Sequence, residues 1–185
     1  MPEIWDVLDS NANLVGRTCV RGPMRAGEYH LVVGVWVLRS DGQFILSKRS
    51  PNKPMGNMWE ATGGSAIAGD DSLTTAIKEV HEELGITLLP ENGQFFKRYR
   101  RDFAQTYDGG WAQVANGDGS HGGDFVDIWL FRQDFELSDI TLCPEETCDA
   151  MLADCVTIRR MLNDGIMVDF MAEHYDNFFA WCGLE

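Results

Sequence analysis

The stretch GSAIAGDDSLTTAIKEVHEELGI, residues 64–86, decides how this chain is interpreted. Its second half has the period of an α-helix, because apolar residues recur there at spacings of four, three and four. These residues are Leu73, Ile77, Val80 and Leu84. Gly85 follows at the position where a left-handed glycine commonly ends a helix. The pattern therefore predicts a helix over 72–84.

The same helix carries three carboxylates on a face turned away from its apolar stripe. At about 100° per residue, the three lie within about 100° of one another and roughly 135° from that stripe. They are Glu79, Glu82 and Glu83. Neighbouring like charges cost about 0.2 to 0.5 kcal/mol per pair unless a cation lies between them. Taken alone, the pattern fits either a divalent cation site or a solvated acidic helix face.

Length and charge exclude several classes of function. A chain of 185 residues, 44% hydrophobic and 24% charged, has the composition of one globular domain spanning residues 1–185. Fifteen Lys and Arg against 29 Asp and Glu leave a net charge of −14, which opposes binding to nucleic acid or anionic lipid. We therefore expect neither nucleic acid nor membrane as a partner. A phosphorylated ligand would need a cation at its site.

The cysteines and the N-terminus indicate the compartment. The five cysteines are odd in number and show no C-x-x-C or zinc-type spacing, which favours reduced thiols. The N-terminus lacks the regions of a signal peptide, and the longest apolar run, 31–38, is too short to span a bilayer. We expect a cytoplasmic protein, monomeric or homodimeric.

Strand patterns surround the helix. Two segments that flank a cluster of turn formers predict an N-terminal β-hairpin over about 5–20. The continuous apolar run 29–38 predicts a strand buried on both faces, with 43–48 returning as its partner. A short strand over 59–62 ends at Gly63.

The second half of the chain predicts further strands and two helices. Strands are expected over 95–105 and 125–132, separated by a glycine-rich connection or lid, and helices over 157–163 and 167–181. The last helix carries a stripe that we assign to the core, made of Phe170, Met171, Tyr175, Phe178 and Phe179.

The spacing around the first helix resembles the Nudix box. The sequence reads Gly64-x5-Asp70-x7-Lys78-Glu79-Val80-x-Glu82-Glu83-x-Gly85-Ile86, and seven of the nine specified positions match the Nudix pattern. An R-S-x-x-K segment and a G-x-x-W segment precede the box, so the resemblance covers about 5–86. It implies a Nudix-type α/β/α sandwich with a mixed central β-sheet. It also implies a Mg²⁺-dependent hydrolase that cuts a diphosphate linkage in a nucleoside, sugar or other diphosphate–X substrate.

The resemblance assigns metal-binding roles to Glu79, Glu82 and Glu83, and to the carbonyl of Gly63. Hard oxygen ligands suit Mg²⁺ or Mn²⁺. Such an ion polarises a diphosphate and activates a water, so Glu82 and Glu83 are also catalytic candidates.

Two box positions depart from the family pattern. Asp70 stands where the family has Glu, and Lys78 stands where it has Arg. The resemblance implies that these two form a structural ion pair, with Asp71 as an alternative acidic partner. A lysine lacks the bidentate fork of arginine, so a looser brace is expected. Gly64 and Gly85 complete the structural part of the box.

Outside the box, four residues are candidates for catalysis and substrate binding. Glu145 and Glu146 follow in the order along the chain that suits a further metal ligand or general base, although an acidic loop is often solvated surface. Arg49 and Lys53 lie on the loop before the box, where they could clamp phosphate oxygens.

Aromatic and histidine residues leave the identity of X open. Trp59, Phe103 and Trp111 could stack on a base or cover an apolar chain. His121 has no partner pattern, and His30 is expected to be a hydrogen-bonded core residue.

Two other functions stay open. The E-Y-H, R-S-x-x-K and G-x-x-W segments also resemble the isopentenyl-diphosphate isomerase branch, but that branch has a cysteine directly after the tryptophan strand and this chain has none there. A non-catalytic diphosphate-sensing Nudix module is the third hypothesis. Retention of all three glutamates favours the hydrolase.

Overall fold

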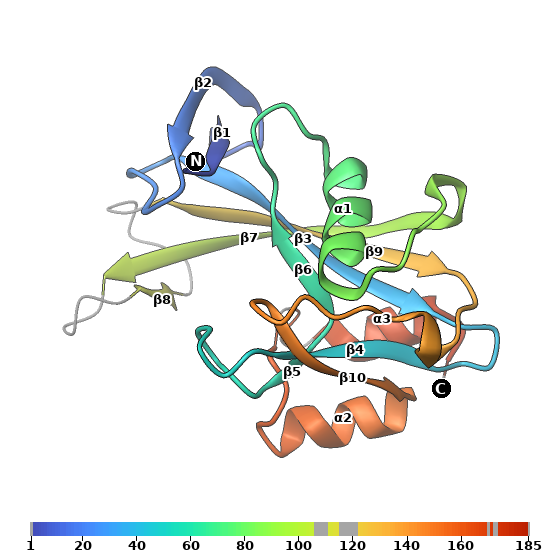
Figure 1. The fold of residues 1–185 in the computed structure, drawn as a ribbon. Helices are drawn as coiled ribbons and strands as arrows, with labels where there is room; N and C mark the ends of the chain where they lie inside the picture. Colours follow the sequence, from blue (N-terminus) through green and yellow to red (C-terminus); the bar gives the residue numbers. More distant parts are fainter. Residues whose placement is uncertain (1, 106–110, 115–121, 170, 172–173, 185) are drawn as a thin grey trace.

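The computed structural model describes residues 2–105, 111–114, 122–169, 171 and 174–184, and for 103–105 and 111–114 it describes the backbone alone. A mixed β-sheet runs through the centre of the molecule (Figure 1). Its main path has the order β10-β4-β3-β9-β7-β8, in which β3 and β9 are parallel and the other pairs are antiparallel. These strands are β3 (Tyr29–Leu38), β4 (Phe44–Arg49), β7 (Gly93–Gln105), β8 (Trp111–Val114), β9 (Gly123–Arg132) and β10 (Thr147–Ala153).

Four shorter strands complete the sheet. The predicted N-terminal hairpin is present as β1 (Ile4–Leu8) and β2 (Leu14–Val20), and β1 continues onto the start of β3. β6 (Thr62–Ser65) pairs with the middle of β3, and β5 (Trp59–Glu60) pairs with β4. β3 therefore has β9 along one edge and shares its other edge among β1, β6 and β4.

Helices cover both faces of the sheet (Figure 1). On one face, Val33, Val35 and Val37 of β3 pack in a cluster with α1 (Ser72–Leu84). On the other face, Trp36 packs with α2 (Cys155–Asn163) and α3 (Tyr175–Trp181). Alternate residues of β3 point to opposite faces, so this one buried strand serves both cores. The predicted α/β/α sandwich is confirmed. Two 3-10 turns, Pro90–Asn92 and Leu137–Asp139, lie in the connections.

Helix α1 has the predicted bounds. Its first turn is capped by Asp71, whose Oδ1 accepts a hydrogen bond from the backbone N of Thr74 at 2.7 Å. Gly85 ends it with φ of 71° and donates its N–H to the carbonyl of His81. A side chain at Gly85 would be strained and would crowd Thr141, which explains the glycine.

Two expectations about the rest of the chain need correction, and one strand was not predicted. The last helix begins at Tyr175, not at residue 167, because Met167 forms a parallel bridge with Trp59 beside the sheet. β4 meets β3 only through the pair of Leu38 and Phe44. Its long partner is β10, a strand that was not predicted from the sequence.

The C-terminal aromatic stripe lies in the core as predicted. Met171, Tyr175, Phe178 and Phe179 are buried, and Phe170 falls outside the described residues. The five cysteines are free thiols. None of the helices in the described ranges is long and apolar enough to cross a membrane.

Candidate active site

A cleft of about 560 Å³ opens where β6 meets β3 beside the C-terminal half of α1. Most of the residues singled out from the sequence line it, although they come from separate parts of the chain. From that set the cleft contains Glu79, Glu82, Glu83, Gly63, Gly64, Arg49, Lys53 and Glu146. Glu145 is not among the lining residues.

Two glycines allow β6 to lie close to its neighbours. Gly63 pairs with Gly34 of β3, and a Cβ on Gly63 would overlap the carbonyl oxygen of Val33. A Cβ on Gly64 would overlap the carboxylate of Glu79. The missing side chains therefore leave room for that carboxylate against the strand.

Burial perturbs two of the three glutamates. Glu83 is 3% exposed, and burial, reinforced by the nearby Glu60 carboxylate, raises its pKa to about 8. Its Oε2 is buried and has no hydrogen-bond partner among the residues that the structure describes. Burial and the charge of Glu82 raise the pKa of Glu79 to about 7.

These groups fit a divalent cation. A buried carboxylate oxygen without a partner is costly, and a hard cation would satisfy it while removing the repulsion between the acids. Within the described ranges, no three His, Cys, Asp or Glu side chains are already gathered at ligand distances. An ion would therefore have to draw the glutamates together from the positions seen here.

Arg49 lies in the cleft, where two of its three guanidinium nitrogens already donate hydrogen bonds. Its Nη1 lies 2.8 and 2.6 Å from the two carboxylate oxygens of Glu60, and its Nε donates to the carbonyl of Pro54 at 2.7 Å. Glu60 is 2% exposed, and burial raises its pKa although Arg49 opposes the rise. Glu60 is not among the site residues predicted from the sequence, because its only local signal is its place as an acidic residue in a short apolar strand.

Glu145 and Glu146, the two candidate acids in the loop before β10, lie in different surroundings. Glu146 lines the cleft and its carboxylate contacts the Lys53 ammonium. Glu145 is exposed, and its Oε2 lies 3.5 Å from the Cys143 thiol. Ser50 ties the two loops together, because its Oγ donates to the carbonyl of Pro144 at 2.6 Å. Lys53 and Glu146 are thus held face to face at the rim.

The two divergent box residues contact each other. Lys78 Nζ lies 2.6 Å from Asp70 Oδ2, and the lysine side chain is 47% exposed. Asp71, the alternative partner, caps α1 instead.

Another part of the cleft wall was not predicted as a site. The ring of His30 stacks on Trp5 with centroids 3.9 Å apart and planes at 5°. Next to it, both carboxylate oxygens of Asp124 accept hydrogen bonds from Arg101 at 2.7 Å. His30 therefore lines the cleft as a stacked, half-buried ring, and burial lowers its pKa. Pairing between strands that are distant in sequence brings these residues together, so no local sequence pattern predicts their proximity.

The aromatic candidates for binding X do not line the cleft in the described part of the chain. Trp59 packs against the core, and Lys48 Nζ lies 5.4 Å from its ring centroid. The side chains of Phe103 and Trp111, and all of His121, lie outside the described residues.

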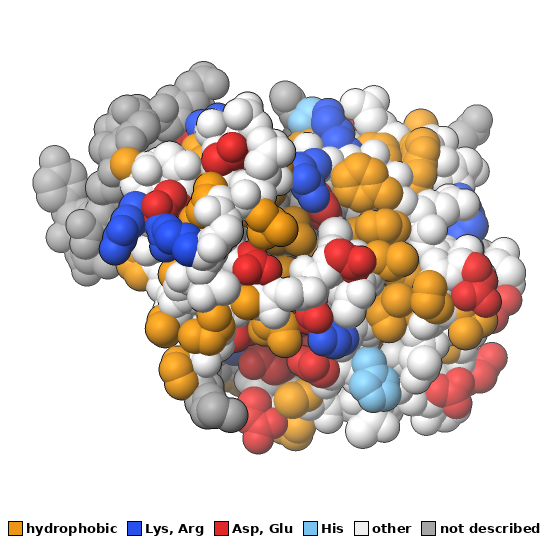
Figure 2. Space-filling model, turned by 90° about the horizontal axis from the view of Figure 1, so that it is seen from above, with side chains coloured by type: hydrophobic (Ala, Val, Ile, Leu, Met, Phe, Trp, Pro, Cys, Tyr) orange, Lys and Arg blue, Asp and Glu red, His pale blue; other side chains and the backbone are white. Residues whose placement is uncertain are grey.

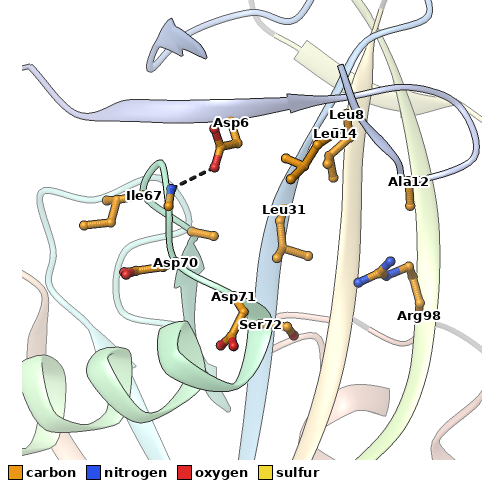
Figure 3. A pocket seen from close by; sticks show the side chains of 12 residues that line it. Asp6, Leu8, Ala12, Leu14, Leu31, Ile67, Asp70, Asp71, Ser72 and Arg98 are labelled. Carbon is orange, nitrogen blue, oxygen red and sulfur yellow. Dashed lines mark hydrogen bonds between the residues drawn. The ribbon is translucent and has the colours of Figure 1, made fainter. Parts of the chain in front are cut away.

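A separate pocket of about 320 Å³ lies at the other end of α1, beneath the β1–β2 hairpin (Figure 3). Its polar side chains serve the fold: Asp6 Oδ2 accepts the N–H of Gly69 at 2.7 Å, and Arg98 pairs with Asp127. The remaining wall is largely apolar, with Leu8, Leu14 and Leu31 pointing inward. Figure 2 shows the molecule from above, with acidic side chains spread among hydrophobic ones and not gathered in one patch.

Comparisons with known proteins agree with this geometry. Residues 28–181 match the sequence model described as the NUDIX domain. The Nudix hydrolase lmo0368 of Listeria monocytogenes is 32% identical over 171 residues, which cover 91% of this chain and 89% of that protein.

Solved structures share the fold. The crystal structure of DR0079 from Deinococcus radiodurans has a TM-score of 0.65 at 17% identity, covering 95% of this chain and 98% of that one. A bifunctional NMN adenylyltransferase/ADP ribose pyrophosphatase from Francisella tularensis, complexed with AMP and a Mn ion, has a TM-score of 0.54 at 16% identity. That match covers 84% of this chain and 41% of the other.

Proposed function

This chain belongs to the Nudix family, and we propose that it is a Mg²⁺-dependent hydrolase that cuts a diphosphate linkage in a nucleoside, sugar or other diphosphate–X substrate. One observation carries the proposal: the buried, unpaired Oε2 of Glu83 lies in the same cleft as the Glu79 carboxylate. A solvated acidic helix face would not bury its carboxylates in this way. We therefore assign Glu79, Glu82, Glu83 and the Gly63 carbonyl to the metal.

A bound Mg²⁺ would supply charge to polarise the diphosphate and would lower the pKa of an attacking water. Mn²⁺ offers the same chemistry, and the Francisella tularensis neighbour is complexed with a Mn ion. In this chain Glu146 is the candidate proton acceptor at the rim, with Glu82 and Glu83 as alternatives and Glu145 left outside the cleft. Lys53 is a candidate phosphate contact once its ammonium leaves Glu146.

For Arg49 we propose a positioning role in addition to the predicted phosphate contact. Its guanidinium holds Glu60 and the loop carbonyl of Pro54, so it positions the loop that carries Lys53. Lys53, on the loop that Arg49 holds, is the second candidate phosphate contact.

The isomerase alternative lacks the catalytic cysteine of that branch. Among the described residues that line the cleft there is no cysteine. Cys19 lies on β2, with its Sγ 3.9 Å from the sulfur of Met24. A sensing module would bury Glu79 and Glu83 around a metal equally well, so turnover, measured as described below, separates it from the hydrolase. We infer a small-molecule diphosphate as the partner, with no nucleic acid or membrane, and a cytoplasmic monomer or homodimer.

The test is hydrolysis of a panel of nucleoside, sugar and alkyl diphosphates, scored by phosphate or pyrophosphate release. We expect activity that stops on chelation and returns with Mg²⁺ or Mn²⁺. Full activity in excess chelator would contradict the metal dependence. Isopentenyl diphosphate in heavy water should give no allylic isomer, and an isomer formed at enzymatic rates would favour the isomerase.

A further inference from the structure

A second cavity, of about 320 Å³, adjoins the cleft. The two spaces have four lining residues in common, which we term the shared wall: Trp5, Arg21, His30 and Asp124. Among the described lining residues, the three glutamates belong to the cleft and the cavity has none of them. A substrate whose diphosphate lies at the glutamates therefore meets the shared wall with its X group.

Two ring nitrogens of the shared wall are buried without a partner. Trp5 Nε1 and His30 Nδ1 have no hydrogen-bond partner among the residues that the structure describes. In the described lining of the cleft, only Glu83 shares this condition, and its oxygen is assigned to the metal. A buried donor or acceptor without a partner is costly, and a ligand that supplies the partner removes that cost. The shared wall therefore favours an X group that brings hydrogen-bonding atoms.

The chemistry of the two rings narrows the kind of group. The indole nitrogen of Trp5 can only donate. Burial lowers the pKa of His30, so its imidazole is neutral at neutral pH, with one nitrogen that donates and one that accepts. A hydroxyl group, or the amide edge of a base, both accepts and donates, so it can pair with both rings in either tautomer of His30. An alkyl chain can pair with neither.

Stacking on Trp5 is not open to X. The ring of Trp5 stacks on that of His30 with centroids 3.9 Å apart, and Trp5 is 5% exposed, so neither face is free. The hydrogen-bonding edges of the two rings are what remains for recognition.

Arg21 is the part of the shared wall that can move to admit X. Its side chain is 64% exposed, and its guanidinium carbon lies 5.8 Å from the centroid of Trp5. In the described part of the chain, the guanidinium is hydrogen-bonded only to Glu3, through Nη1 at 2.6 Å. Exposed ion pairs contribute little, so Arg21 can leave Trp5 at small cost and use its other donors on X. Asp124, in contrast, is held through both oxygens by Arg101 at 2.7 Å.

We infer that Trp5 and His30 are specificity-determining residues that bind X through hydrogen bonds, so that X carries a hydroxyl or amide group beside the two rings. The inference rests on the proposed hydrolase function. A sugar ring and a nucleobase edge both supply such a group, and the substrates of the experiment separate these two sources.

The experiment compares kcat/KM, in the presence of Mg²⁺, for UDP, its dideoxyribose analogue, ribose diphosphate and pentyl diphosphate. Two hydrogen bonds at about fivefold each predict that UDP exceeds pentyl diphosphate by about 25-fold, mainly through KM. If the sugar hydroxyls are the source, the dideoxy analogue falls towards the pentyl compound and ribose diphosphate does not. If the base edge is the source, ribose diphosphate falls and the dideoxy analogue does not.

Two variants test the rings themselves. Trp5→Phe and His30→Phe keep an aromatic ring and remove the ring nitrogens, so each should reduce the preference for UDP over pentyl diphosphate by about fivefold. Trp181→Phe is the matched control, because Trp181 is 41% exposed on α3 and lines neither space. It should leave the preference unchanged.

A kcat/KM for pentyl diphosphate equal to or above that for UDP would overturn the inference and leave the proposed hydrolase standing. So would an unchanged preference in Trp5→Phe and His30→Phe. If one of these variants does not fold, the other and the substrate series decide.

Binding is measured in parallel, as the shift in melting temperature with the methylene-bridged analogues of UDP and of pentyl diphosphate. If no diphosphate is hydrolysed, the hydrolase proposal fails. The assignment of Trp5 and His30 then holds only if the UDP analogue gives the larger shift and the Phe variants reduce the difference. Equal shifts overturn it.

Discussion

Arg49 and Glu60 form an ion pair beneath the cleft, with side chains that are 13% and 3% exposed. A buried pair of this kind contributes little net stability compared with apolar residues, but loss of one partner leaves a charge buried and unpaired. Both partners must therefore be present for the fold to remain stable. Arg49 also holds the loop that carries Lys53.

Arg49→Met should lower the free energy of unfolding by about 3 to 5 kcal/mol, because Glu60 is left unpaired. The double variant Arg49→Met/Glu60→Gln should recover a large part of that loss. Urea unfolding monitored by fluorescence measures both. If the double variant is as unstable as the sum of the two single variants, the two side chains are not coupled.

At the scale of elements, α1 depends on its N-cap. Asp71→Ala removes the acceptor for the N–H of Thr74 and should cost about 1 kcal/mol of stability. Asp71→Ser retains an acceptor and should cost less. Thermal unfolding of the two variants gives the comparison.

Asp70→Ala is the matched control for the cap. It removes only the pairing with Lys78, whose side chain is 47% exposed, so a loss of about 0.2 to 1 kcal/mol is expected. Equal stability of Asp71→Ala and Asp71→Ser would show that the cap assignment is wrong.

The elements that were predicted correctly are those with a complete local pattern. Helix α1 has its apolar period, its three acids and its terminal glycine within one continuous stretch. β10 was missed because its first residues follow an acidic turn, and its pairing with β4 joins segments about a hundred positions apart. The late start of α3 has the same cause, since Trp59 holds Met167 in a bridge.

The candidate site likewise has residues that a local sequence pattern identifies and residues that only strand pairing brings together. The glutamates, Gly63 and Lys53 could be named from the Nudix box and the loop before it. Trp5, Asp124 and Arg101 could not, because only the register of β1, β9 and β7 brings them beside His30.

At the scale of the whole molecule, the chain carries a net charge of −14. Two of its carboxylates, Glu79 and Glu83, also have pKa values that burial raises. A carboxylate with a folded-state pKa above its unfolded value of about 4.5 favours the folded state less as it ionises. Stability of the metal-free protein should therefore fall as the pH rises from about 4.5 through 8.

The test is the melting temperature of metal-free protein between pH 5.5 and 8.5 for wild type and Glu83→Gln. The wild type should lose more stability over this range than the variant, which has no carboxyl group to ionise at that position. Comparing the two removes the opposite contribution of His30, whose pKa is lowered by burial. Parallel curves would show that Glu83 has an ordinary pKa.

The central claim, that Glu79, Glu82 and Glu83 hold one divalent cation, is tested most directly by the Mg²⁺-induced shift in melting temperature at pH 7.5. At about a hundredfold above Kd, an ion that binds only the native state adds ~2.7 kcal/mol, which corresponds to several degrees. We predict that Glu83→Gln loses most of the shift. Lys78→Ala should keep it, because Lys78 contacts Asp70 and not the glutamates. Equal Mg²⁺ shifts in wild type and Glu83→Gln would contradict the claim and leave the carboxylates without a metal role.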